Sequence, residues 1–115
     1  MIFEYKLIKQ KSTNIFQLFG ELIDRNQATE LLAEIDANIR SGENKILLNL
    51  QNLRYINSSG LNVLINILTK ARKEGGDVAI CCVNNKIKEL LVITKLDSIF
   101  NVSDNEEMAT EILNK

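Results

Sequence analysis

The segment from residue 45 to residue 83 decides the fold, and it reads KILLNLQNLRYINSSGLNVLINILTKARKEGGDVAICCV. It opens with KILLNL, residues 45–50, a nearly continuous apolar run that is typical of a strand covered on both faces. Helical periodicity follows over about residues 58–73 and stops at Gly75 and Gly76, and DVAICCV, residues 77–83, is a second apolar run. A strand, a helix and a strand in succession predict an α/β sheet.

The N-terminal part of the chain alternates between apolar and polar residues before its periodicity changes. Residues 2–9, IFEYKLIK, predict a half-exposed strand that pairs with a second strand over residues 15–22, IFQLFGEL, in an antiparallel hairpin or meander. From about residue 26 to residue 41 the spacing predicts a helix, and Gly42 follows where a left-handed cap would need it. The apolar stripe of this helix is Ala28, Leu31, Leu32, Ile35 and Ile39.

The C-terminal part predicts two further helices around a short strand, SIFNV, at residues 98–102. The candidate caps are Asn84 or Asn85 for the first helix, and the capping boxes Ser103 with Glu106 or Asp104 with Glu107 for the second. Their apolar residues are Ile87, Leu90 and Leu91 in the first helix and Met108, Ile112 and Leu113 in the second. The order ββαβαβαβα predicts one α/β domain over residues 1–115, with a mixed β-sheet flanked by helices.

The charge balance argues against whole classes of partner. Fourteen basic and fifteen acidic residues give a net charge of −1, so no field of one sign exists to attract nucleic acid or an anionic membrane. No apolar run approaches the roughly 18 residues that a membrane span needs, and MIFEYKLIKQ lacks the layout of a signal peptide. We expect a cytoplasmic monomer with no nucleic-acid partner and no membrane insertion.

The chain has no histidine, which removes the commonest general base and the commonest metal ligand. Its two cysteines, Cys81 and Cys82, are adjacent, and in a strand their side chains would point to opposite faces. Two thiols cannot complete a four-ligand zinc site. We expect reduced, partly buried structural thiols, with redox sensing as the alternative, and we predict no metal and no cofactor.

The helix over residues 58–73 begins at an unusual cluster of capping residues. Asn57, Ser58 and Ser59 fall at its cap and first turn, directly before Gly60. The helical wheel predicts a buried stripe and an opposite polar face, with Val63 and Ile67 on a partly exposed flank beside Lys70. The stripe is Leu61, Leu64, Ile65, Leu68 and Ala71, and the polar face is Asn62, Asn66, Thr69 and Lys73.

Three interpretations of the two serines follow from local chemistry. In the first, the residues only satisfy the first backbone N–H groups of the helix. In the second, one serine accepts a phosphate, because the positive end of the helix dipole stabilises an added anion and the helix does not melt. Gly60 would then leave a bare patch where a partner's backbone can approach. In the third, Ser58 is a nucleophile, which the missing histidine and the wrong glycine pattern argue against. No nucleotide-binding glycine loop occurs either.

Long strings of the chain resemble the STAS domain of bacterial anti-sigma factor antagonists. They are LLNLQNLRYINSSGLNVLINILTKARKEGGDVAICCVN, IKELLVITKLDSIFNVSDNEEMA and FQLFGELIDRNQATEL, which together cover nearly the whole sequence. The resemblance implies the mixed sheet expected above. It also implies binding to an ATP-dependent serine kinase that is also an anti-sigma factor. This binding would release the sigma factor from the kinase. The kinase would phosphorylate the first serine of the motif, Ser58, and a metal-dependent serine phosphatase would restore the active form.

The chain departs from the family pattern at two places. Asn57 stands where the family usually has an aspartate before the phosphoacceptor, and the aspartate of the family's GELD motif comes one residue later here, as Asp24 of GELID. Asp24 is then either a helix-start carboxylate or a contact to the kinase, and Val63 is either a partner-facing residue or an ordinary flank residue. The candidate partner-binding residues are Asp24, Asn57, Ser59, Gly60, Asn62 and Val63.

Two alternatives to a phosphorylation-controlled binding module, which is not an enzyme, stay open at this point. One keeps the fold without the switch, as a scaffold or a transport-associated subunit such as the cytoplasmic partner of a lipid-export ATPase. The neutral Asn57 favours this alternative. The other is a small hydrolase that uses Ser58, against which the missing histidine counts.

Overall fold

The helices and strands of the computed structural model, which describes residues 2–10 and 12–114, follow the predicted order. Two short 3-10 helices, η1 and η2, are added to the expected elements. The elements are β1 (Phe3–Gln10), β2 (Thr13–Leu22), η1 (Arg25–Ala28), α1 (Thr29–Arg40), β3 (Lys45–Ile56), α2 (Ser58–Lys73), β4 (Asp77–Cys81), α3 (Asn85–Ile93), η2 (Leu96–Ser98), β5 (Asn101–Ser103) and α4 (Glu106–Leu113).

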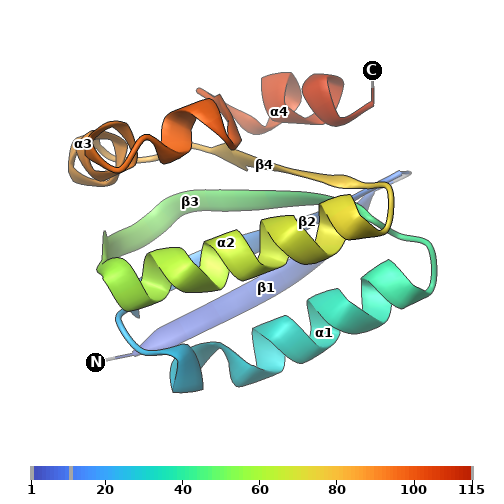
Figure 1. Cartoon of the computed structure of the whole chain (residues 1–115), viewed down its shortest axis with the longest axis horizontal. Helices are drawn as coiled ribbons and strands as arrows, with labels where there is room; N and C mark the ends of the chain where they lie inside the picture. Colours follow the sequence, from blue (N-terminus) through green and yellow to red (C-terminus); the bar gives the residue numbers. More distant parts are fainter. Residues whose placement is uncertain (1, 11, 115) are drawn as a thin grey trace.

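The five strands form one mixed sheet in the order β1-β2-β3-β4-β5. β1 and β2 make the antiparallel hairpin that the N-terminal alternation predicts, and every other neighbouring pair is parallel. Figure 1 shows α1 and α2 side by side on one face of the sheet and α4 on the opposite face. The predicted α/β class and its mixed sheet flanked by helices are therefore confirmed.

Strand β3 is longer than its apolar run, and its extra length positions the candidate site. The run KILLNL ends at Leu50, but β3 continues to Ile56 and pairs there with Leu22, the last residue of β2. The two strands therefore end together, and the start of α2 lies beside the turn that leads from β2 into η1. A hydrogen bond from the Asn57 N–H to the Leu22 carbonyl, at 3.4 Å, closes this junction.

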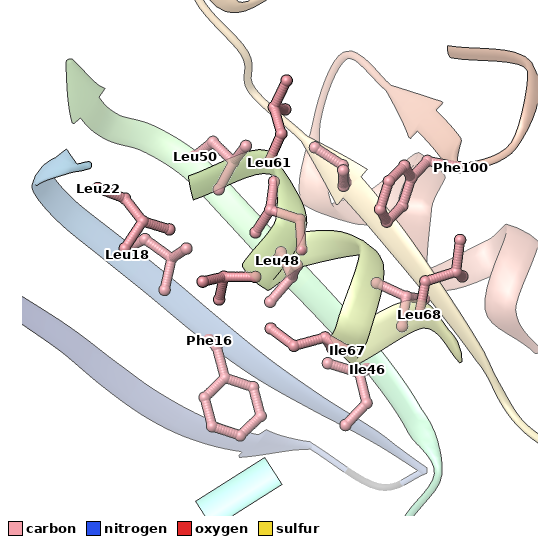
Figure 2. Packing of buried hydrophobic residues seen from close by; sticks show 14 of the residues in the cluster. Phe16, Leu18, Leu22, Ile46, Leu48, Leu50, Leu61, Ile67, Leu68 and Phe100 are labelled. Carbon is pink, nitrogen blue, oxygen red and sulfur yellow. The ribbon is translucent and has the colours of Figure 1, made fainter. Parts of the chain in front are cut away.

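The main core lies between the sheet and the layer of α1 and α2. Its members come mainly from β2, β3, β4, α1 and α2, and Ile87 and Leu91 of α3 also belong to it. Figure 2 shows Phe16, Leu18, Leu22, Ile46, Leu48 and Leu50 of the sheet around Leu61, Ile67 and Leu68 of α2, with Phe100 nearby. A smaller cluster, formed around Ile15, Leu47 and Ala79, packs under α4 on the other face.

The flank of α2 is buried, so one expectation about it is wrong. Val63 is 1% exposed and Ile67 is fully buried, whereas Ile65, which the wheel places in the stripe, is only half-buried. The reason is tertiary: α2 packs against the sheet and also along α1, which covers the flank that a single buried stripe would leave open. The remaining stripe residues, Leu61, Leu64, Leu68 and Ala71, are buried as expected.

The boundaries near the C-terminus differ from the sequence prediction. Residues 98–102 do not form one strand, because η2 ends at Ser98 and β5 begins only at Asn101. Both predicted capping boxes of the last helix are wrong, because Ser103 is a buried residue of β5 and Asn105 caps α4 through the N–H of Met108, at 2.9 Å. Met108 is 46% exposed, and the buried residues of α4 are Ala109 and Leu113.

Two helix-end predictions near the sheet are confirmed. Asn84 caps α3, because its side-chain oxygen accepts the N–H of Ile87 at 2.8 Å. Gly42 has a φ of +92°, the left-handed conformation expected after α1.

Candidate functional site

The start of α2 is held by Asn57, which hydrogen-bonds in two directions. Its side-chain oxygen accepts the N–H of Gly60 at 3.0 Å, and its side-chain nitrogen donates to the carbonyl of Ile23 at 3.1 Å. The first bond caps α2, and the second ties that cap to the turn after β2. An aspartate at this position would keep the cap but would lack the donor for Ile23, so the asparagine suits this chain's own backbone.

Ser58 and Ser59 are the first two residues of α2, and both side chains are exposed. The first N–H groups of a helix lack intrahelical partners and carry the positive end of its dipole. No acidic residue lies in the first turn of α2 to offset that charge. The hydroxyl of Ser58 is therefore within reach of another molecule, at a place where an added anion is electrostatically favourable.

Gly60 does not form the bare patch that the sequence suggested for a partner. It is buried, and a Cβ placed on it would collide with the carbonyl oxygen of Leu22 and with the side chain of Ile56. The glycine instead allows the first turn of α2 to pack directly against the ends of β2 and β3. Its role in the fold is internal, so the expected bare patch at Gly60 is wrong, and a contact of Gly60 to a partner stays a prediction.

Asp24 has the geometry of a helix-start carboxylate. Its side chain accepts the N–H of Asn26 at 3.0 Å, and the side-chain oxygen of Gln27 accepts the Asp24 N–H at 3.0 Å, which completes a capping box at η1. The Asp24 side chain is also exposed. Its predicted contact to a kinase stays a prediction.

Two shallow grooves flank the start of α2. The first, of about 430 Å³, brings Asp24, Ser59 and Asn62 together along one side of the helix. Asn62 and Ser59 are exposed, but Val63 contributes almost no surface, so the partner-facing interpretation of Val63 is not supported by its 1% exposure. The structure thus brings three predicted partner-binding residues, Asp24, Ser59 and Asn62, together in one groove, and their contact to a partner stays a prediction.

The second groove was missed from the sequence. It measures about 320 Å³ and brings Ser58 next to Arg54 and Tyr55 of β3 and to Lys86 and Leu90 of α3. Tyr55 is 49% exposed. The groove forms because α3 is anchored at the end of β3. The anchoring contacts are hydrogen bonds from the Asn84 side chain to the carbonyls of Leu53 and Arg54, at 3.3 and 3.4 Å.

A larger hollow than these two grooves, of about 760 Å³, lies elsewhere, between β1 and the start of α1. Tyr5 lines it and donates its hydroxyl to Glu34 at 2.6 Å. Burial of the phenol and the nearby Glu34 carboxylate together raise the pKa of Tyr5 to about 12. Tyr5 therefore stays protonated at neutral pH and fastens β1 to α1, so its role is structural.

The chain is a small α/β domain with a mixed sheet and an exposed, polar helix start. Residues 5–109 match the STAS domain family. The anti-sigma F factor antagonist of Paenibacillus polymyxa is 33% identical over 93 residues, which are 80% of this chain and 79% of that protein. The "Putative anti-sigma factor antagonist BtrV" of Bordetella bronchiseptica is 31% identical over 88 residues, which are 76% of each protein.

A solved structure agrees with these matches over the full fold. The crystal structure of a "putative anti-sigma factor antagonist" from Thermotoga maritima superposes with a TM-score of 0.84 at 30% identity, over 98% of this chain and 95% of that one. The chain belongs to the STAS domain family, and its relatives are named anti-sigma factor antagonists. Within residues 2–10 and 12–114, no helix combines the length and apolar character that crossing a membrane requires.

Proposed function

We propose that the chain is an anti-sigma factor antagonist that binds an anti-sigma serine kinase and is switched off by phosphorylation of Ser58. Family membership supports the antagonist part of the proposal. The observation that carries the switch is the position of Ser58, exposed at the first residue of α2 with no acidic side chain in that turn. A phosphate there is tolerated by the fold and changes the surface at one defined place.

The fold tolerates the phosphate because the cap does not depend on Ser58. Asn57 holds the first turn through Gly60 and Ile23, so the serine hydroxyl is not needed for the helix to start. A phosphoserine brings about −1.5 to −2 charges, and the positive end of α2 favours them. The modified chain therefore keeps its structure, as a reversible switch requires.

The phosphate blocks binding because Ser58 lies between two candidate contact surfaces. Asp24, Ser59 and Asn62 line the groove on one side, and Tyr55 and Leu90 line the groove on the other. A partner that packs over both grooves must cover Ser58 closely. A dianion buried in that contact is desolvated or repelled, which costs on the order of 2–5 kcal/mol. The kinase is then released, and a serine phosphatase restores binding by removing the phosphate.

The chain acts in this cycle as a substrate and a binding module, not as an enzyme. A serine nucleophile needs a base within hydrogen-bond reach, and the sequence has no histidine to supply one. The functional chemistry of Ser58 is therefore supplied by the kinase and the phosphatase.

The test is phosphorylation of the purified chain by its cognate kinase with ATP. We expect one phosphate on the wild-type chain, none on Ser58→Ala, and one on Ser59→Ala, which is the matched control because Ser59 is also exposed and lies at the next position. Intact mass and peptide mapping measure the label. Equal labelling of Ser58→Ala and the wild-type chain would show that the site is wrong, and no labelling of any variant would favour the scaffold alternative without a switch.

A further inference from the structure

The two cysteines come together in a way that a continuous strand would not allow. β4 ends at Cys81, and Cys82 has a φ of +64°, in the left-handed region that residues with a Cβ rarely adopt. The turn brings the two sulfur atoms within 3.3 Å of each other. The expectation that the side chains point to opposite faces is therefore wrong, because Cys82 has already left the strand.

The two cysteines differ in burial, because Cys81 is buried and Cys82 is partly accessible. Cys81 is buried in the cluster under α4, with Leu47, Ala79 and Ala109 among its neighbours. Cys82 is half-buried and lines a groove of about 480 Å³, which lies between α3 and β5. A small molecule that enters this groove contacts Cys82, and the sulfur of Cys81 lies 3.3 Å from the sulfur of Cys82.

We propose that Cys81 and Cys82 form a two-sulfur binding site for a thiophilic centre of the trivalent organoarsenical class. A centre bonded to both sulfurs at about 2.3 Å, the usual zinc–thiolate length, spans a 3.3 Å pair at an S–centre–S angle of about 90°. A disulfide, at about 2.05 Å, would require the sulfurs to move closer by more than 1 Å. The observed separation suits a bridging atom better than a direct bond.

The number of protein ligands and the protonated Cys81 thiol favour this class over a zinc ion. Burial, with a smaller contribution from the hydrogen bond to Cys82, raises the pKa of the Cys81 thiol, so it stays protonated at neutral pH. Zinc binds thiolates and takes four protein ligands in structural sites, and the described part of the chain offers no group of three or more candidate ligands. A trivalent arsenical with two hydroxyl groups needs only two thiols, and its condensation with them releases two molecules of water.

The reaction balances without an oxidant. Two As–O bonds break and two As–S bonds form, and each thiol proton leaves with a hydroxyl group as water. The arsenic stays trivalent, and neither sulfur changes its oxidation state. The product is a ring that contains both sulfurs, and an added dithiol reverses its formation by exchange.

The two cysteines should bind the arsenical more tightly in the folded chain than in the unfolded chain. In the unfolded chain, Cys82 would seldom occupy the left-handed conformation that brings the sulfurs together. A ligand that binds the folded chain more tightly than the unfolded chain raises the unfolding temperature. Each tenfold preference for the folded chain corresponds to roughly 5 °C for a domain of this size.

The experiment adds phenylarsine oxide, hydrated in water to the dihydroxy form, to the reduced full chain. We expect one adduct by intact mass with loss of both free thiols, reversal by 2,3-dimercaptopropanol, and a rise of the unfolding temperature by several degrees. Two variants serve as controls. Cys82→Ser keeps one thiol and should lose the stable adduct, and Cys82→Ser combined with Val83→Cys keeps two thiols that are not adjacent and should lose the rise in unfolding temperature.

Three results would overturn the inference. The first is the absence of a one-to-one adduct on the wild-type chain. The second is an equally stable adduct on Cys82→Ser, which would mean that one thiol is enough. The third is a lower unfolding temperature with the arsenical, which would mean that the unfolded chain binds better and that the folded geometry is not a site.

Discussion

The starts of α2 and α4 use the same cap and differ in charge. Asn57 accepts the N–H of Gly60 at 3.0 Å, and Asn105 accepts the N–H of Met108 at 2.9 Å, so each asparagine closes the first turn at the same position. The first turn of α4 carries Glu106 and Glu107, whereas that of α2 carries no acidic residue. At α4, two carboxylates offset the positive end of the helix dipole. At α2, the exposed hydroxyl groups of Ser58 and Ser59 occupy the same two positions.

The two helix starts differ in whether their negative charge is a permanent part of the fold. Glu106 is part of the structure, because its carboxylate accepts a hydrogen bond from the Asn49 side chain at 2.5 Å. No comparable internal partner is needed at Ser58, which faces outward. A permanent negative charge stabilises the start of α4, and we propose that a reversible one is added at the start of α2.

We expect the largest difference in the free energy of unfolding between substitutions at Gly60 and Met108, the third residues of α2 and α4. Gly60→Ala should lower the free energy of unfolding by about 3 kcal/mol or more, because the added methyl group collides with the carbonyl of Leu22. Met108→Ala, at the matching position of α4, should change it by less than about 0.5 kcal/mol, since Met108 is 46% exposed. Urea denaturation measures both. Similar effects at the two positions would contradict the close approach of α2 to β2.

The two capping asparagines give the next contrast. Asn57→Ala removes the cap and also the hydrogen bond to Ile23, so it should cost about 2 kcal/mol, whereas Asn105→Ala should cost about 1 kcal/mol. Asn57→Asp sharpens the comparison because it keeps the acceptor and loses only the donor. It should be less stable than the wild-type chain despite its good capping oxygen, and a more stable Asn57→Asp chain would show that the Ile23 bond is unimportant.

Charge substitutions give the smallest effects, with opposite signs at the two helices. Ser58→Asp should raise the free energy of unfolding by about 0.5 kcal/mol, because it places a carboxylate at the positive end of α2. Glu107→Gln should lower it by a similar amount at α4. Both effects should shrink as salt is added. A lower free energy of unfolding for Ser58→Asp at low salt would contradict the claim that the start of α2 favours an added negative charge.

The order of the elements along the chain and the caps at Asn57 and Asn84 were predictable because their causes are local. The alternation of β1, the apolar runs of β3 and β4, and the capping chemistry at Asn57 and Asn84 each depend on a few neighbouring residues. The exposure of Ser58 and Ser59 follows from the same local logic, since a helix that buries Leu61 and Leu64 must present its capped start to solvent.

The errors arose where distant parts of the chain decide the environment. Val63 is buried by a second helix that no wheel of α2 can reveal, and Gly60 is enclosed by Leu22, 38 positions earlier in the sequence. The groove between Ser58 and Lys86 joins residues of β3, α2 and α3, and the Asn84 side chain hydrogen-bonds α3 to β3 across 31 positions of the sequence. Cys82 leaves the strand at a left-handed residue, which neither composition nor periodicity signals.

The most direct test of the account is the affinity of the kinase for the chain with and without a phosphate on Ser58. Phosphoserine placed at residue 58 during synthesis avoids any dependence on the labelling reaction, and circular dichroism checks that the fold is unchanged. Titration calorimetry should give an affinity at least about 100-fold lower for the phosphorylated chain, because a dianion lies between the two grooves. Equal affinity of the two forms for the kinase would contradict the switch.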